Sequence, residues 1–220
     1  MWKYKDQIIK ERADLQIDAI GFVGQGLFFS RFLVQLLLSE KYKKVVTPSI
    51  FWKLSLLASI IFFVYGYLRE DFSIMLGQSI TYFIYIRNLQ LQKEWQKMNK
   101  GFQLFLFAFP VFIVIYAYNN GVYDLDKLLR NGNIPFWLLT LGIVAQLVFI
   151  FRFVYQWLSS EKKKSSHLPL GFWIISLTGS LLILTYSIFR VDKVLFIAHS
   201  VGMFVYMRNI YLLRKQNESA

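Results

Sequence analysis

Long apolar stretches alternate with short polar segments along the whole chain. The apolar stretches lie at about 19–38, 50–68, 72–91, 102–118, 136–158, 170–189 and 192–213. An α-helix needs roughly 20 apolar residues to cross a bilayer, whereas a membrane β-strand shows about 10 residues of strict alternation. Because the apolar runs here are continuous, the pattern predicts an all-α transmembrane fold with seven spanning helices.

The composition agrees with a membrane location. Of the 220 residues, 56% are hydrophobic and only 17% are charged, against about 25% charged in a typical soluble domain. Cysteine is absent, which excludes disulfides, thiolate catalysis and cysteine-based metal sites. Seven spans leave no room for a soluble catalytic domain, so we expect a single polytopic membrane unit.

The chain contains an internal repeat with an offset of 121 residues. Aligning 20–94 with 141–215 without a gap gives roughly 27 identities in 75 positions. Polar residues stay in register: Gln25 with Gln146, Arg31 with Arg152, Gln35 with Gln156, Ser39-Glu40-Lys41 with Ser160-Glu161-Lys162, Ser55 with Ser176, Ser59 with Ser180, Arg69-x-Asp71 with Arg190-x-Asp192, Tyr85 with Tyr206 and Arg87-Asn88 with Arg208-Asn209. Chance matching of two apolar segments would pair Leu and Phe rather than these residues. The repeat therefore indicates a duplication.

Each copy holds three predicted spans, and an odd number would invert the second copy. The extra span at 102–118 restores its direction, which predicts a seven-helix bundle with 3+1+3 parallel repeats. We divide the chain into an N-terminal arm at 1–18, repeat 1 at 19–94, a linker with one span at 95–135, repeat 2 at 136–215 and a tail at 216–220. For the arm, a short helix on the membrane surface and a frayed terminus both stay open.

The loop charges predict an orientation. The side that holds the loops at 39–49, 87–101 and 159–169 and the tail carries 13 Lys and Arg, against nine on the other side. Positive loops favour the cytoplasmic side, so the pattern predicts a cytoplasmic C-terminus and a periplasmic arm. The net charge of +12 then belongs to loops near anionic lipid, and no basic soluble face suits nucleic acid.

The repeated motif resembles the lipid A biosynthesis N-terminal domain family. The motif runs from Gln25 to Asn88 and from Gln146 to Asn209, and it includes Pro48 with Pro169 and Phe51-Trp52 with Phe172-Trp173. That family is similar in design to PQ-loop and SWEET-type proteins, although the Pro-Gln dipeptide is absent here. It occurs fused to or beside lipid-A-disaccharide synthase and other glycolipid enzymes in Gram-negative bacteria. The resemblance implies a multi-pass inner-membrane protein of lipid A or related glycolipid metabolism; it does not imply synthase activity.

Arg31 and Arg152 are the most informative polar residues, because each lies inside an apolar span. A cation there costs about 2.5–3.5 kcal/mol or more on insertion scales. Gln35 and Gln156 follow at i+4 on the same helix faces. Guanidinium groups bind phosphate in a bidentate fashion, so the four residues predict a site for a phosphorylated head group. Two alternatives stay open: the arginines snorkel or pair with Glu40 and Glu161, or they set the register between helices.

Six further residues complete the predicted substrate-binding set: Gln25, Gln146, Gln78, His199, Asn88 and Asn209. His199 and Gln78 are equivalent positions, and a hydrogen bond to a neighbouring helix competes with a proton-relay role for His199. Lys53 lacks a basic counterpart and is expected to snorkel. The paired tyrosines and tryptophans suit interfacial belts or bundle packing.

The sequence contains none of the common catalytic motifs that we considered: an acyltransferase His-Asp pattern, a nucleophile elbow, a P-loop or a metalloprotease motif. We predict no catalytic residues, no metal and no cofactor. The favoured hypothesis is a translocator for a phosphorylated glycolipid or a polyprenyl-phosphate-linked sugar, with an anionic lipid as its partner. The alternatives are a non-transporting anchor or partner subunit of a glycolipid glycosyltransferase, docked through Lys41–Lys44 and Lys162–Lys164, and a small-sugar transporter of the SWEET type.

Overall fold

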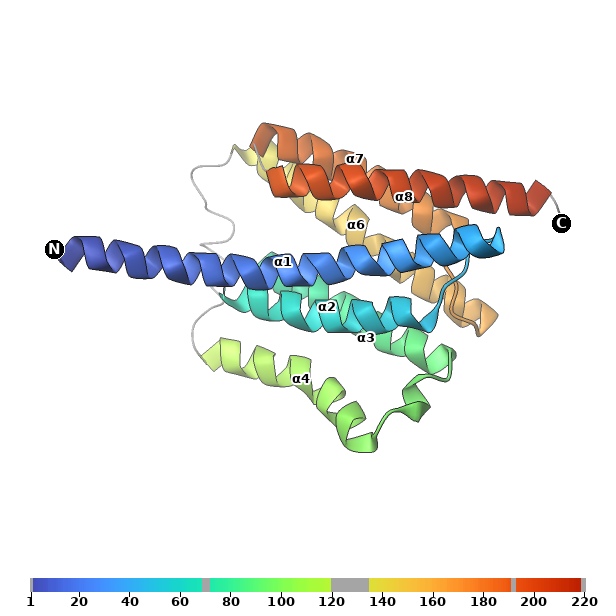
Figure 1. Ribbon diagram of the computed structural model, residues 1–220, viewed down its shortest axis with the longest axis horizontal. Coiled ribbons are helices and arrows are strands. Elements are labelled where there is room, and N and C mark those ends of the chain that lie inside the picture. The colour runs from blue at the N-terminus through green and yellow to red at the C-terminus, as the bar shows by residue number, and fades with distance from the viewer. Residues whose placement is uncertain (1, 69–71, 120–134, 191–192, 219–220) are drawn as a thin grey trace.

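The computed structural model describes residues 2–68, 72–119, 135–190 and 193–218. These residues form seven α-helices and one short 3₁₀ helix, and no strand occurs among them (Figure 1). The helices are α1 (Trp2–Tyr42), α2 (Ser49–Leu68), α3 (Phe72–Leu91), η1 (Trp95–Lys97), α4 (Lys100–Asn119), α6 (Phe136–Lys163), α7 (Leu170–Arg190) and α8 (Lys193–Glu218). Every predicted span coincides with one of the α-helices, which confirms the all-α transmembrane fold class.

Four helical segments of the described chain are long and apolar enough to cross a membrane. They are Leu15–Tyr42 of α1, all of α2, all of α6 and Leu170–Phe189 of α7. A shorter apolar stretch, Lys100–Phe112, lies in α4. Helices α3 and α8 have the predicted positions but lie outside this group of four, because their sequences are more polar. The structure therefore supports membrane association through the first two helices of each repeat.

The two repeats run in the same direction. In Figure 1, α1, α3, α6 and α8 all point toward the end of the bundle where the C-terminus lies, while α2, α4 and α7 point back. Within each repeat the middle helix packs along both of its neighbours, and the repeats touch through α3 with α6 and through α1 with α8. The reversed helix α4, in the linker, gives repeat 2 the same direction as repeat 1.

The N-terminal arm is the first part of α1. The helix is continuous from Trp2 to Tyr42, about 60 Å at 1.5 Å per residue, and it extends beyond the rest of the bundle (Figure 1). The structure thus differs from both open interpretations of residues 1–18. No Gly or Pro occurs between Trp2 and Ile20, so the helix of the first span continues without a break.

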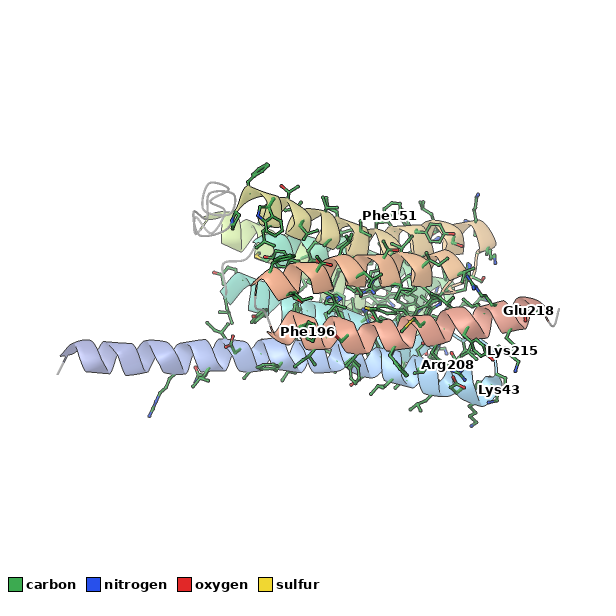
Figure 2. All side chains as sticks on the ribbon, turned by 90° about the horizontal axis from the view of Figure 1, so that it is seen from above. Lys43, Phe151, Phe196, Arg208, Lys215 and Glu218 are labelled. Carbon is green, nitrogen blue, oxygen red and sulfur yellow. The ribbon has the colours of Figure 1, made fainter. Side chains whose placement is uncertain are left out.

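One end of the bundle carries the basic loops. Lys43, Arg208 and Lys215 lie toward that end, and Phe196 lies toward the other (Figure 2). Helices α1 and α6 finish there with the same C-terminal motif, in which the equivalent residues Lys43 and Lys164 have positive φ angles of 53° and 50°. In each copy the two backbone N–H groups after the helix return to the last turn.

Lys53 is anchored at this end by a carboxylate. Its Nζ lies 2.5 Å from Oε2 of Glu94, just before η1, and Lys97 pairs with the same carboxylate. The hydrogen bonds from these two lysines lower the pKa of Glu94 from 4.5 to about 2. The sequence predicts that Lys53 snorkels to water. Instead its ammonium group ties α2 to the connection between α3 and α4.

Close contact between α6 and α7 depends on a missing side chain. A Cβ atom on Gly179 would lie 3.1 Å from the Cα atom of Phe149. That neighbour is backbone, so it cannot yield by rotating a side chain. Gly26 of α1, by contrast, has no atom within 4 Å of a Cβ built on it.

We therefore expect Gly179→Val to force α6 and α7 apart and Gly26→Val to be tolerated. Overpacking of this kind lowers the free energy of unfolding by roughly 1–3 kcal/mol, whereas an exposed substitution stays within about 0.5 kcal/mol. Unfolding of the purified protein in detergent, followed by circular dichroism, measures both variants. Equal loss in the two variants would contradict the close α6–α7 packing.

Candidate anion-binding site

Arg31 lies inside the bundle, where α1 faces α2 and α3. Only 2% of the residue is exposed. Its Nη1 donates to Ser55 Oγ at 2.7 Å and to the Tyr85 hydroxyl at 3.2 Å. Both acceptors are neutral and belong to the same repeat, so they hold the guanidinium group without cancelling its charge.

Arg152 has the equivalent environment in repeat 2. It is 3% exposed, and its Nη1 donates to the Tyr206 hydroxyl at 3.0 Å and to Ser176 Oγ at 3.4 Å. Ser176 and Tyr206 are the repeat-2 counterparts of Ser55 and Tyr85. The duplicated sequence therefore folds into a duplicated set of contacts.

Two phenylalanine rings, from Phe32 and Phe153, connect the two guanidinium groups. The Arg31 guanidinium carbon lies 4.9 Å and 5.3 Å from the Phe32 and Phe153 ring centroids, and that of Arg152 lies 5.8 Å and 4.7 Å from them. Arg152 also stacks on Phe149 at 3.5 Å. Such cation–π contacts contribute up to about 2 kcal/mol each in a desolvated site. Each cation is thus surrounded by aromatic rings from both repeats.

No carboxylate among the described residues neutralises either arginine. The ion pairs among the described residues do not include Arg31 or Arg152. The alternative in which Arg31 pairs with Glu40 or Glu161, or snorkels to water, is therefore wrong, because both guanidinium groups are buried and the glutamates bind elsewhere. Two uncompensated positive charges remain in an apolar bundle, which favours an anionic ligand.

Gln35 and Gln156 form an interlock between the repeats. Gln156 exchanges two hydrogen bonds with Asn88 of repeat 1, at 2.8 and 3.1 Å, and Gln35 donates to Asn209 of repeat 2 at 2.8 Å. All four amide side chains have 0% exposure. These predicted binding residues are therefore brought together, one turn from the arginines, but they bind each other across the repeat interface.

Two ion pairs continue the interlock at the basic end. Arg87 of α3 binds the Glu161 carboxylate of α6 with two nitrogens, and Arg208 of α8 binds the Glu40 carboxylate of α1 in the same way. Each pair joins one repeat to the other.

The other candidate residues lie apart from the arginines. Gln25 is half-buried and Gln146 is exposed, and neither contacts the guanidinium groups. His199 Nδ1 lies 2.9 Å from Ser180 Oγ, in line with the structural interpretation of this residue. The Gln78 side-chain oxygen is buried and accepts no hydrogen bond from the described residues. Asp71 and Asp192, which keep the repeat offset, lie outside the described residues.

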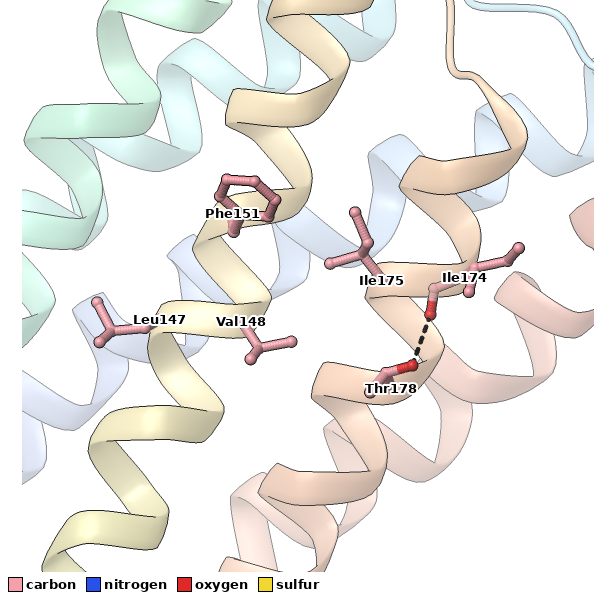
Figure 3. A pocket seen from close by; sticks show the side chains of 6 residues that line it. All are labelled: Leu147, Val148, Phe151, Ile174, Ile175 and Thr178. Atoms are coloured by element: carbon pink, nitrogen blue, oxygen red, sulfur yellow. Dashed lines mark hydrogen bonds between the residues drawn. The ribbon is translucent and has the colours of Figure 1, made fainter.

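An apolar groove of about 440 Å³ lies on the outer side of repeat 2, between α6 and α7 (Figure 3). Its lining consists of Leu147, Val148, Phe151, Ile174, Ile175 and Thr178. The Thr178 hydroxyl donates to the Ile174 carbonyl of its own helix at 3.1 Å, so it offers the groove little polarity. Such a surface suits a hydrocarbon chain. No group of three His, Asp or Glu side chains that could hold a metal ion occurs among the described residues.

Sequence reasoning missed the residues that complete the two arginine sites. For Tyr85 and Tyr206 the sequence favours interfacial belts or bundle packing. Both are buried in the bundle, as the second alternative predicts, and their hydroxyls also accept hydrogen bonds from the guanidinium groups. Phe32 and Phe153 were not singled out at all. A usable signal exists in the repeat, because Tyr85 with Tyr206 and Phe32 with Phe153 both keep the 121-residue offset.

These features define a class: a helical membrane protein built from two parallel three-helix units, with paired cations buried at their junction. The chain belongs to the Lipid A Biosynthesis N-terminal domain family, whose pattern matches residues 20–90 and again 141–211. The two matches coincide with the two repeats, so the predicted duplication and family are confirmed. No solved structure matches the chain.

Curated relatives with the same helical region are larger proteins. The chain is 28% identical over 205 residues to lipid-A-disaccharide synthase of Chlamydia pneumoniae, covering 91% of this chain and 34% of that protein. It is 27% identical over 208 residues to the synthase of Chlamydia felis, covering 90% and 33%. The chain thus spans about a third of the length of these relatives. Its family relates the chain to lipid A biosynthesis, a bacterial process.

The amide interlock gives a test of how the repeats are joined. Gln156→Leu removes both hydrogen bonds to buried Asn88, so we expect the free energy of unfolding to fall by roughly 1–3 kcal/mol. The same substitution at exposed Gln146 of the same helix should change it by less than about 0.5 kcal/mol. Denaturant unfolding in detergent measures both variants, and adding Asn88→Leu in a double-mutant cycle reports the coupling. Additive effects would argue against a direct pair.

Proposed function

We propose that this protein binds a phosphorylated glycolipid, or a polyprenyl-phosphate-linked sugar, at Arg31 and Arg152 and moves its head group across the membrane. The single observation that carries the proposal is the pair of buried guanidinium groups, neither of which has a carboxylate partner among the described residues. An arginine offers five N–H donors in a planar fork that matches phosphate geometry. The Ser and Tyr hydroxyls beside each arginine orient that fork.

A lipid ligand needs a place for its chains as well as its head group. The α6–α7 groove is apolar and lies on the same helices as Arg152 and Ser176. A phosphoryl group held between the repeats and a hydrocarbon chain held in the groove would occupy opposite sides of one helix pair. The kinship with lipid-A-disaccharide synthases supports a glycolipid over other anionic lipids.

Movement would take place at the junction of the repeats. Most of the specific contacts across it lie at the basic end, in the amide interlock and the two Arg–Glu pairs. In the proposal, opening of these contacts gives the head group access from that end, and rocking of one repeat against the other gives access from the opposite end. The basic end faces the cytoplasm of a bacterial inner membrane by the charge rule.

A second candidate function is a membrane anchor or partner subunit of a glycosyltransferase. The observation that favours it is the kinship with lipid-A-disaccharide synthases, of which the helical region forms only about a third. Here the exposed lysines after α1 and α6, including Lys43 and Lys164, would form the docking surface. The buried arginines would then stabilise the fold and have no ligand.

The double variant Arg31→Gln/Arg152→Gln distinguishes the two functions. In vesicles that contain the purified protein, we expect the double variant to lose at least about tenfold in flipping of a fluorescent polyprenyl-phosphate-linked sugar, since each charged hydrogen bond contributes about 1.5–3 kcal/mol. Arg214→Gln, an exposed arginine of α8, is the control and should keep the activity.

Unchanged flipping in a folded double variant would contradict the arginine site. Absence of flipping by the wild-type protein, together with recovery of a glycosyltransferase that charge reversal at Lys162–Lys164 releases, would instead support the anchor function.

A further inference from the structure

Each repeat contains two buried N–H donors that no described group accepts. In repeat 1 they are Arg31 Nε and Trp52 Nε1, and in repeat 2 they are Arg152 Nε and Trp173 Nε1. The tryptophans have 0% exposure and the arginines at most 3%. Guanidinium and indole N–H groups only donate, and a buried donor without an acceptor costs about 1–3 kcal/mol. The four unpaired donors occupy equivalent positions in the two repeats. This indicates that a bound ligand supplies their acceptors.

The donors form two separate sets, each organised by a tyrosine. Trp52 packs on the Tyr85 ring at 6.0 Å, and Arg31 binds the hydroxyl of the same tyrosine. In repeat 2, Trp173 packs on Tyr206 at 6.1 Å, and Arg152 binds that hydroxyl. Every member of a set belongs to one repeat, so each three-helix unit carries a complete half-site.

The half-sites meet at the two phenylalanine rings that both guanidinium groups contact. Phe32 packs edge-to-face on Tyr206 at 5.7 Å, and Phe153 packs edge-to-face on Tyr85 at 5.3 Å. Each ring is therefore held by the tyrosine of the opposite half-site. A single anion that bound both arginines equally would have to displace this aromatic contact between the repeats, whereas two anionic groups could occupy the half-sites separately.

From these observations we infer that the ligand carries two anionic groups, one for each repeat, and belongs to the class of bis-phosphorylated lipids. This inference rests on the proposed function and narrows its substrate class. Two negative charges balance the two buried cations. Because each phosphoryl group binds residues of only one repeat, the ligand bridges the repeats and stabilises their association.

Native mass spectrometry of the purified full chain, titrated with defined lipids, tests the inference. The probes are cardiolipin, which has two separate phosphodiesters, phosphatidylglycerol, which has one, phosphatidic acid, which has one phosphomonoester, and zwitterionic phosphatidylethanolamine as a control. We expect cardiolipin to bind at least about tenfold more tightly than phosphatidylglycerol, the factor that one additional charged hydrogen bond contributes. Two phosphatidylglycerol molecules should replace one cardiolipin at saturation.

Variants locate the two groups. In Arg31→Gln and in Arg152→Gln, cardiolipin should lose its advantage and bind within about twofold of phosphatidylglycerol, because one half-site is gone. Trp52→Phe and Trp173→Phe keep an aromatic ring but remove the donor, and each should weaken cardiolipin about threefold or more. Trp137→Phe, at an exposed position of α6, should have no effect. Circular dichroism verifies that each variant is folded.

The possible failures are distinguishable. Equal affinity for cardiolipin and phosphatidylglycerol in the wild-type protein would overturn the two-group inference while leaving an anionic lipid site in place. Phosphatidic acid binding as tightly as cardiolipin, and depending on both arginines, would also overturn it in favour of one doubly charged group. If no anionic lipid bound better than phosphatidylethanolamine, the proposed function itself would fail.

Discussion

Two buried guanidinium groups impose the central constraint on this structure. Placing Arg31 and Arg152 in an apolar bundle costs several kcal/mol in total, and no carboxylate among the described residues offsets that cost. Instead, two hydroxyl groups accept hydrogen bonds from each guanidinium group, and several aromatic rings pack against it. Neutral partners preserve the positive charge, whereas an ion pair would have cancelled it. This property suits the proposed binding and release of an anion.

The duplication determines how the rest of the bundle is arranged around that constraint. Equivalent residues make equivalent contacts at the arginines, at the ends of α1 and α6, and across the repeat interface. The symmetry is incomplete in informative places. His199 binds Ser180, whereas the side-chain oxygen of its counterpart Gln78 has no donor in the described part of the chain. Lys53 pairs with Glu94 where repeat 2 has Ile174. The two halves therefore have the same framework but different surroundings.

The candidate site was predictable in part. A charge inside an apolar span is conspicuous in any sequence, and its repetition at a fixed offset marks Arg31 and Arg152 as a pair. The same reasoning assigned Gln35 and Gln156 to the ligand because they follow at i+4 on the same helix face. That spacing describes a single helix and carries no information on the neighbouring helix. The structure shows that each glutamine binds an asparagine of the opposite repeat: Gln35 donates to Asn209, and Gln156 donates to Asn88.

The sequence by itself determined the helical class, the positions of the apolar stretches that form the described helices, the duplication and the shared direction of the repeats. Each of these follows from local hydropathy, helix length and the parity of the crossings. Only the tertiary structure decided which side chains meet between repeats. Contacts such as Phe153 on Tyr85 and Arg87 on Glu161 join residues 68 and 74 positions apart. Such pairings depend on how whole helices pack, and a one-dimensional pattern does not contain that information.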